Sequence, residues 1–416
     1  MQAGKLLARK KVIAWCLFDW ATSPFSVLIT TFIFANYFTQ QVAINNIIGT
    51  AQWGEVNGAA GLIVAFLSPV LGAIADYDGR RKPWLMALTP IMIISAAALW
   101  FVKPEHDYVV WALTWVMVGT MAIEISMVFY NAMLNELVPA NFLGRLSGLG
   151  WGFGYVGGIV ALIIALLLIQ TLPSEAQPVR LCGPLVAVWV LAFAWPLFAF
   201  TPDRPFSGQG WYANIKQGIE SLIKTLSLLR FEYRNILIFL IARMLYIDGL
   251  ITVFAFGGIY AAGVFHMTLT EVIEFGIGMN ISAGLGAVIF GWLDDSKGPK
   301  LTILATLSLM VACGIGILLV DSKLWFWILG MGLSLGVGPV QAASRSLLIR
   351  IAPAHLITEL FGLYNLSGRA TSFIGPWVLA LFTHWFYSQR VGMSTVFLFM
   401  VTGGIMLALV KNAKIS

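Results

Sequence analysis

The sequence consists mainly of long apolar stretches, each of helical length, separated by short polar breaks. A membrane helix needs roughly 20 mainly apolar residues, and only helices or closed barrels satisfy the backbone inside a bilayer. The stretches lack the short alternating segments of a barrel. With 59% hydrophobic and 11% charged residues over 416 positions, the chain has too little polar surface for a water-soluble domain. The sequence therefore predicts an all-α polytopic membrane protein, and it argues against a soluble enzyme.

Twelve spans can be placed between the polar breaks, six before and six after one long polar stretch. The expected spans are 13–38, 54–75, 84–102, 108–134, 144–170, 181–200, 235–262, 271–293, 300–320, 324–348, 357–386 and 393–410. We therefore expect an N-terminal six-helix bundle over 1–200, a cytoplasmic central loop over 201–234 and a C-terminal six-helix bundle over 235–416.

The distribution of basic residues predicts the orientation. Most of the 25 Lys and Arg residues fall at the two termini, in the central stretch and in alternate short loops. By the positive-inside rule these segments are cytoplasmic, and the first span is an uncleaved helix. Basic loops also account for the net charge of +6 without a nucleic-acid partner. Three separated cysteines and four dispersed histidines favour neither a disulfide nor a metal site, and no cofactor motif is present.

The two predicted bundles resemble each other in sequence. VPANFLGRLSGLG at 138–150 aligns without a gap with APAHLITELFGLY at 352–364, and GAIADYDG at 72–79 aligns with GWLDDSKG at 291–298. An even number of spans makes two such repeats parallel, related by an axis along the membrane normal. This is transporter architecture. Chance matching among Gly- and Pro-rich loops is the alternative.

The loop after the second span resembles the signature of the major facilitator superfamily, G-x-x-x-D-x-x-G-R-R/K. The matching residues are Gly72, Asp76, Gly79, Arg80, Arg81 and Lys82, and a weaker copy keeps Gly291, Asp295, Gly298 and Lys300. A positive-inside loop explains the basic residues but not the Gly and Asp positions. The resemblance implies a latch that holds the outward-facing state, with gating residues Asp76, Gly79, Arg80, Arg81, Asp295, Gly298 and Lys300. Because Arg80 aligns with Pro299, we expect an asymmetric latch.

Two further segments resemble the autophagy-related vacuolar effluxer branch of that superfamily and its bacterial relatives of unassigned substrate. They are WCLFDWATSPF in the first span and ARMLYIDGLITVF in the seventh, where Tyr246, Asp248 and Gly249 cluster. The resemblance implies a secondary active transporter that works by alternating access, as a monomer, in a bacterial cytoplasmic membrane.

Ionised residues inside the predicted spans mark candidate functional positions. A charge at the bilayer centre costs about 2.5–3.5 kcal/mol even on a lenient scale, so each requires a partner or a watery cavity. Polar residues recur at helical spacing beside several of these charges, as in Asp19, Ser23 and Ser26. The predicted substrate or proton pathway comprises Asp19, Ser23, Ser26, Glu124, Asn131, Arg243, Tyr246, Asp248, Arg345, Asn365 and Arg369. The alternative is structural: polar residues join helices, and Glu124 or Asp248 neutralises a buried arginine.

A glycine stripe marks a close helix contact in each bundle. Gly150, Gly154 and Gly158 recur every four residues in the fifth span, and Gly278, Ser282 and Gly286 do so in the eighth. These spans meet across the two halves of a major facilitator, so we expect smooth faces there. Dense static packing is equally consistent with the pattern.

The uneven division of charge suggests the substrate class. The first half supplies Asp19 and Glu124, whereas the second supplies three arginines with one acid, Asp248. We expect a zwitterionic or anionic solute such as an amino acid, with an arginine meeting a carboxylate and an acid meeting an amine or carrying a proton. Efflux of amino acids is what the resemblance implies. A drug or metabolite exporter, with a cavity dominated by Trp, Phe and Met, and a membrane receptor without transport are the alternatives.

Overall fold

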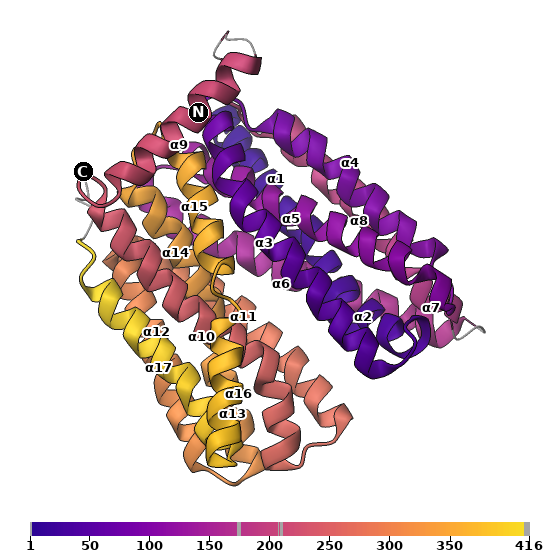
Figure 1. Cartoon of the computed structure of the whole chain (residues 1–416). Coiled ribbons are helices and arrows are strands. Elements are labelled where there is room, and N and C mark those ends of the chain that lie inside the picture. Colours follow the sequence, from indigo (N-terminus) through magenta and orange to yellow (C-terminus); the bar gives the residue numbers. More distant parts are fainter. Residues whose placement is uncertain (1, 173–175, 207, 209–210, 412–416) are drawn as a thin grey trace.

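The computed structural model describes residues 2–172, 176–206, 208 and 211–411, and nearly all of these are helical (Figure 1). Residues 1 and 412–416, the outer limits of the predicted bundles, lie outside the described part. Within that part, eleven helices are long and apolar enough to cross a membrane. The predicted span 357–386 is instead two shorter helices that meet at a turn. The all-α polytopic class is therefore confirmed, although one expected span is broken.

The elements up to residue 200 follow the six predicted spans closely. They are α1 (Gln2–Pro24), the π-helical η1 (Phe25–Phe32), α2 (Phe34–Tyr37), η2 (Phe38–Val42), α3 (Asn46–Asp78), α4 (Lys82–Ala98), η3 (Leu99–Phe101), η4 (His106–Tyr108), α5 (Val109–Leu137), η5 (Ala140–Phe142), α6 (Leu143–Thr171), α7 (Ala176–Arg180) and α8 (Cys182–Phe200).

The elements beyond residue 210 begin with a helix inside the predicted central loop. They are α9 (Trp211–Leu228), α10 (Arg234–Phe265), α11 (Leu269–Lys297), α12 (Pro299–Leu319), α13 (Lys323–Leu335), α14 (Val337–Ile351), α15 (Ile357–Arg369), α16 (Ile374–Phe386) and α17 (Gln389–Ala408). A break thus interrupts the tenth predicted span at Gly336, and another interrupts the eleventh between α15 and α16.

Prolines explain where two spans become irregular. Proline has no N–H, so the carbonyl four residues earlier loses its helical partner. Position 24 is where an amide N–H would donate to the Trp20 carbonyl in a regular helix. Because Pro24 has no N–H, that bond is missing, and α1 gives way to η1 at this point. The Trp189 indole N–H donates to the free Trp20 carbonyl at 3.0 Å. Pro376 has the same effect at the start of α16, next to the break in the eleventh span.

The helices gather into two groups, one from the described residues between 2 and 200 and one from residues 234–411 (Figure 1). Both termini lie at one end of the molecule, here called the termini end, and the opposite end is the far end. The two groups touch mainly where α3 packs on α15 and α6 packs on α11.

Glycines allow close approach at both contacts. A Cβ on Gly72 of α3 would collide with the Thr358 carbonyl of α15, and one on Gly148 of α6 would collide with the Ala287 carbonyl of α11. In the aligned repeats Gly72 matches Gly291 and Gly148 matches Gly362, and a Cβ on any of the four would crowd the backbone of the facing helix, which gives the termini end its tight seam.

The expected role of the glycine stripe in the fifth span is wrong. A Cβ on Gly150, Gly154 or Gly158 would meet Trp15, Ser23 or Val27 of the first span, so the stripe packs within its own half. Gly148 and Gly152, which lie beside the stripe on α6, face α11 instead. Spacing alone identified a close contact, but it could not identify the partner helix.

Candidate functional site

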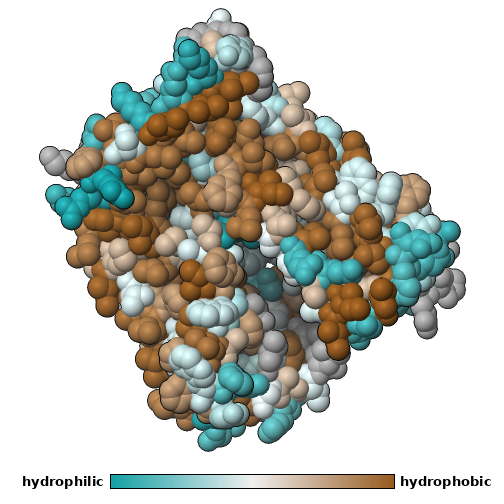
Figure 2. Space-filling view, in the orientation of Figure 1, coloured by the Kyte–Doolittle hydropathy of each residue, from teal (hydrophilic) through white to brown (hydrophobic). Residues whose placement is uncertain are grey.

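A cavity of about 470 Å³ lies between α1, η1, α6 and α11. Its polar lining comes from Asp19, Ser23, Ser26 and Asn280. Most of the wall is apolar, and it includes Val27, Phe32, Ile33, Trp151, Tyr155, Ile159, Leu162, Ile163, Leu166 and Ile277. The surface is hollowed between the two groups of helices, on the side away from the termini (Figure 2). The predicted polar stripe of the first span therefore lines a cavity with one acid.

Asp19 joins the cavity to a buried arginine of the other half. Its Oδ2 accepts a hydrogen bond from the Tyr130 hydroxyl at 2.7 Å and lies 3.8 Å from Nη1 of Arg345. Arg345 comes from α14 and is 3% exposed. It donates to Asn131 Oδ1 at 2.8 Å, to Ser147 Oγ at 2.9 Å and to the Ser147 carbonyl at 2.7 Å. The Arg345 guanidinium thus contacts residues of α1, α5 and α6, three helices of the opposite half.

Aromatic rings pack against this cluster. Trp15 stacks on Tyr130 with ring centroids 4.4 Å apart, and the Arg345 guanidinium lies 5.0 Å from the Trp15 ring centre. A guanidinium over an aromatic face gains cation–π attraction, which is stronger in a site without water. The sequence interpretation missed Trp15, Tyr130 and Ser147, because an uncharged side chain in an apolar span carries no signal of its own.

A second contact between the halves lies at Glu124 of α5. Its carboxylate forms an ion pair with Arg369 of α15, and its carbonyl accepts from Asn365 at 3.0 Å. The side chains of Glu124 and Arg369 remain 25% and 35% exposed. The pair agrees with the alternative that Glu124 neutralises an arginine, although neither side chain is fully buried.

The remaining predicted pathway residues lie in the second half, and none of them lines the cavity. Arg243 donates to the Tyr364 carbonyl at 2.7 Å, and its guanidinium lies 3.4 Å from the Tyr364 ring centre. The Tyr246 hydroxyl lies 2.6 Å from Ser344 Oγ. Asp248 is 3% exposed and has no cation within ion-pair distance in the described part of the chain. The alternative in which Asp248 neutralises a buried arginine therefore finds no support.

At the termini end, Asp76 caps the amino terminus of α15. Its Oδ2 accepts from the amides of Thr358 at 2.8 Å and Glu359 at 2.9 Å, and its Oδ1 accepts from the Thr358 hydroxyl at 2.6 Å. The first amides of a helix lack internal partners and carry partial positive charge. A carboxylate of one half therefore binds a helix terminus of the other.

Asp295 repeats this contact in the opposite direction. It accepts from the amides of Gly144 at 2.8 Å and Arg145 at 3.2 Å, at the start of α6. In the aligned repeats Gly144 and Arg145 match Thr358 and Glu359. Aligned positions of the two repeats therefore form two equivalent contacts, here called the Asp76 clamp and the Asp295 clamp, which join the halves at the termini end.

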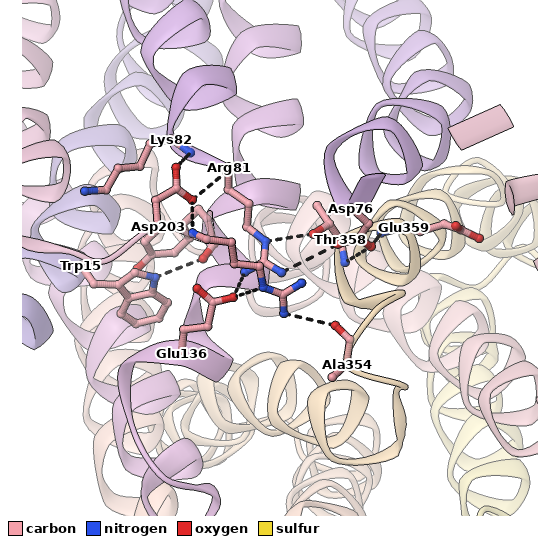
Figure 3. Close-up of polar contacts among 11 residues, drawn as sticks. Trp15, Asp76, Arg81, Lys82, Glu136, Asp203, Ala354, Thr358 and Glu359 are labelled. Carbon is pink, nitrogen blue, oxygen red and sulfur yellow. Dashed lines mark hydrogen bonds and ion pairs between the residues drawn. The ribbon is translucent and has the colours of Figure 1, made fainter. Parts of the chain in front are cut away.

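Only the Asp76 clamp contains a buried arginine from its own loop. Arg81 is 1% exposed, and it donates to Thr358 Oγ1 at 2.9 Å and to Glu136 Oε1 at 2.6 Å (Figure 3). Burial lowers the pKa of this guanidinium, and the carboxylates of Glu136 and Asp76 oppose that shift. Arg204 also binds Glu136, and it donates to the Ala354 carbonyl of the other half at 3.2 Å (Figure 3). The two clamps are therefore asymmetric at this position.

The other residues of the motif serve neighbouring contacts. Gly79 has a φ of 84° at the end of α3, and Gly298 has a φ of 93° before α12, values that favour glycine. Arg80 lies beside Asp78 at 3.3 Å and does not reach across the seam. Lys82 binds the Phe198 and Thr201 carbonyls at the end of α8.

Lys300 lies away from the clamps. It donates to the Ala408 and Val410 carbonyls at the end of α17, as Lys82 does at α8. The acidic and basic partners that the sequence interpretation missed are Glu136, Arg145, Asp294 and Arg350. Their charges were visible in the sequence, but nothing in their spacing indicated which charges would pair. Glu136 pairs with Arg81, Arg145 with Asp295, and Arg350 with Asp294.

A bulkier residue in the seam tests the closed end directly. Gly72→Leu is expected to hold the halves apart, because its side chain would replace the contact with the Thr358 carbonyl. A cysteine placed at Ser68, which is fully buried in this seam, should then react with a maleimide several-fold faster in a background without native cysteines. Gly58→Leu is the control, since a Cβ at Gly58 of the same helix meets nothing within 4 Å. Equal labelling rates in the two variants would contradict this account of the seam.

Comparison with known proteins identifies relatives of the whole chain. The family described as vacuole effluxer Atg22 like matches residues 56–415. The MFS-type transporter YxiO of Bacillus subtilis is 27% identical over 415 residues, which cover 97% of this chain and 95% of the relative. Autophagy-related protein 22 of Candida glabrata is 24% identical over 293 residues, which cover 62% of this chain and about half, 53%, of that longer protein.

Solved structures share the fold at low sequence identity. The human organic anion transporter MFSD10 superposes with a TM-score of 0.77 at 12% identity, covering 96% of this chain and 99% of that one. The transporter FucP in the outward conformation gives a TM-score of 0.75 at 14% identity, covering 97% and 99%. At such identities the likeness establishes the major facilitator fold and nothing about the solute.

Proposed function

Because the chain belongs to the Atg22-like vacuole effluxer family of the major facilitator superfamily, we propose that it moves apolar amino acids across a membrane by proton-coupled alternating access. The observation that carries the proposal is the cavity, in which one carboxylate, Asp19, stands at a mostly apolar wall. A zwitterion with a hydrocarbon side chain fits such a lining.

The charged groups at the cavity and the half-to-half contact suggest how the solute is held. An ammonium group would take the place beside Asp19, whose carboxylate has two neighbours, Tyr130 and Arg345. A carboxylate would meet Arg369, which is more exposed than Arg345, the other arginine that meets an acid within the predicted spans of the opposite half. Hydrogen bonds to charged groups contribute about 1.5–3 kcal/mol each, so two such contacts would orient the solute.

Proton coupling would use Asp19 or Glu124, the two acids within the predicted spans that contact an arginine of the opposite half. Protonation of either acid would weaken its contact with that arginine. Weakened contacts between the halves would favour movement of one half against the other, which is what alternating access requires.

Orientation follows from the basic loops at the termini end. If that end is cytoplasmic, as the positive-inside rule predicts, the clamps close the cytoplasmic side and the hollow faces outward. The proposal places the protein as a monomer in a bacterial cytoplasmic membrane, with export as the direction suggested by the family description. Direction is tested by loading vesicles from each side.

A second candidate, export of lipophilic drugs or metabolites, is favoured by the apolar share of the wall, including Phe32, Trp151 and Tyr155. Exchange assays in vesicles with labelled leucine, and with the lipophilic cation tetraphenylphosphonium, discriminate the two. Leucine exchange that a pH gradient drives supports the first candidate. Exchange of the lipophilic cation alone would overturn it.

Arg369 provides a test of carboxylate recognition. Arg369→Gln is expected to raise the half-saturating concentration of leucine at least tenfold, since a lost charged hydrogen bond costs about 1.5–3 kcal/mol. Leucinamide, which has no carboxylate, should be transported equally by both proteins. Arg390→Gln is the control, because Arg390 pairs with Asp321 in the loop that precedes α13. Equal losses for leucine and leucinamide would assign Arg369 a structural role.

A further inference from the structure

Helix α9 lies across the termini end and contacts both halves (Figure 1). Asn214 donates to Asp78 Oδ1 of α3 at 3.2 Å, and Ser221 donates to Glu359 Oε2 of α15 at 3.0 Å. Between them Gly218 packs on α3, where a Cβ would lie 2.9 Å from the Ile74 Cα. One face of α9 is therefore fitted to the closed seam.

The contacts of α9 reach residues of the Asp76 clamp. The amide of Glu359 binds Asp76, and its carboxylate, on a fully buried side chain, receives the Ser221 hydroxyl. A buried carboxylate that loses a donor is left partly unsatisfied, which is costly. Departure of α9 would therefore weaken the closed seam.

A second face of α9 is apolar and uncovered. Tyr212, Ile219, Ile223 and Leu226 follow one another at i, i+7, i+11 and i+14, so they share one side of the helix. Their exposed fractions are 81%, 40%, 63% and 47%, and no described part of the chain covers them. We call this face the apolar stripe. Along the termini end an apolar band borders hydrophilic surface (Figure 2).

The third face of α9 and its C-terminal flank are polar and mainly basic. Lys216, Gln217, Glu220 and Lys224 are on the helix, and Arg230, Glu232 and Arg234 follow it, so this segment carries four bases and two acids. An amphipathic helix with this division lies in the interface of a bilayer, with its apolar side in the acyl boundary and its bases near anionic headgroups. Helix α9 packs on Ile74 and Asp78 in the last turns of α3, where that candidate membrane span ends, which is the position expected of an interfacial helix.

We propose that α9 is a membrane-seated strap. Its apolar stripe inserts into the leaflet at the termini end, and this insertion holds Asn214 and Ser221 against α3 and α15 at the closed seam. Anionic lipid is the partner. Insertion of the apolar stripe into lipid does not depend on any transport activity. The effect of that insertion on the closed seam rests on the proposed function.

Fluorescent labels on adjacent positions test the seating. The full chain without its native cysteines carries either Ile223→Cys or Lys224→Cys, labelled with an environment-sensitive dye in nanodiscs of phosphatidylglycerol and phosphatidylcholine. The label at 223 is expected to emit at shorter wavelength and to be quenched by spin-labelled acyl chains, and the label at 224 to be quenched several-fold less. Equal, water-like emission at both positions overturns the proposal, as does cross-linking at 223 between two copies of the chain.

A charge on the stripe tests the coupling. In vesicles, Ile223→Glu is expected to raise the labelling rate of a cysteine at Ser68 several-fold, with the milder Ile223→Ser giving a smaller rise if the first variant is poorly folded. Gln217→Glu adds the same charge to the polar face and should leave the rate unchanged. Unchanged labelling in both position-223 variants overturns the coupling. Leucine exchange, measured separately, shows whether the proposed function itself fails.

Discussion

Replacing Asp19 by asparagine is expected to lower leucine exchange at least tenfold, because the amide cannot form the charged hydrogen bond to an ammonium group that contributes about 1.5–3 kcal/mol. Asparagine keeps the size of the side chain and can still accept a hydrogen bond from Tyr130, which lies 2.7 Å away. Packing of the cluster should therefore survive, and the thermal unfolding temperature serves to verify that it does.

The matched control is Ser26→Ala, which removes a polar group from the same cavity wall without changing its charge. It is expected to alter exchange by about two- to tenfold at most, less than Asp19→Asn does, since a neutral hydrogen bond contributes about 0.5–1.5 kcal/mol. The ratio of exchange with and without a pH gradient separates two roles of Asp19. If Asp19→Asn abolishes only the gradient-driven part, Asp19 carries the proton; if it abolishes both parts, Asp19 binds the solute. Unimpaired exchange with and without a gradient would remove Asp19 from the mechanism.

Arg345→Met is expected to reduce the free energy of unfolding by about 3–5 kcal/mol, the typical cost of removing one partner from a buried ionic network. Methionine fills a similar volume, but it leaves Asn131 Oδ1 and Ser147 without their donor and Asp19 without its cation. Because these ligands belong to the opposite half, the loss should loosen the contact between the halves as well as the fold.

A double variant separates the ionic part of this effect from the packing part. Adding Asp19→Asn to Arg345→Met removes the unpaired carboxylate, so the double variant should be more stable than the sum of the two single losses predicts. Lys216→Met is the control for loss of a positive charge, since Lys216 is 68% exposed, and surface pairs are worth at most about 1 kcal/mol. Chemical unfolding in detergent provides the measurement. Strict additivity of Asp19→Asn and Arg345→Met would show that the two charges do not interact.

The fold and the family were predictable from the sequence because they depend on patterns that repeat along the chain. Apolar runs of helical length define the spans, and the motif at Gly72–Lys82 carries the family resemblance together with its weaker copy. The same motif identified Asp76 and Asp295, which indeed bind helix termini across the seam. The breaks at Gly336 and at 370–373 were not predicted, since hydropathy continues through a span in which hydrogen bonding is interrupted.

The sequence by itself thus determined a polytopic helical chain with internal duplication and a small set of intramembrane charges. Only the tertiary structure decided which charges meet: Arg345 with Asp19, Arg369 with Glu124, and Asp248 with no cation in the described part of the chain. It also decided that Gly148, rather than Gly150, faces α11, and that 211–228 is a helix lying on the seam. The physical reason is that helical periodicity fixes which residues share a face. The direction in which that face points depends on rigid-body packing between helices far apart in the chain, which local sequence does not encode.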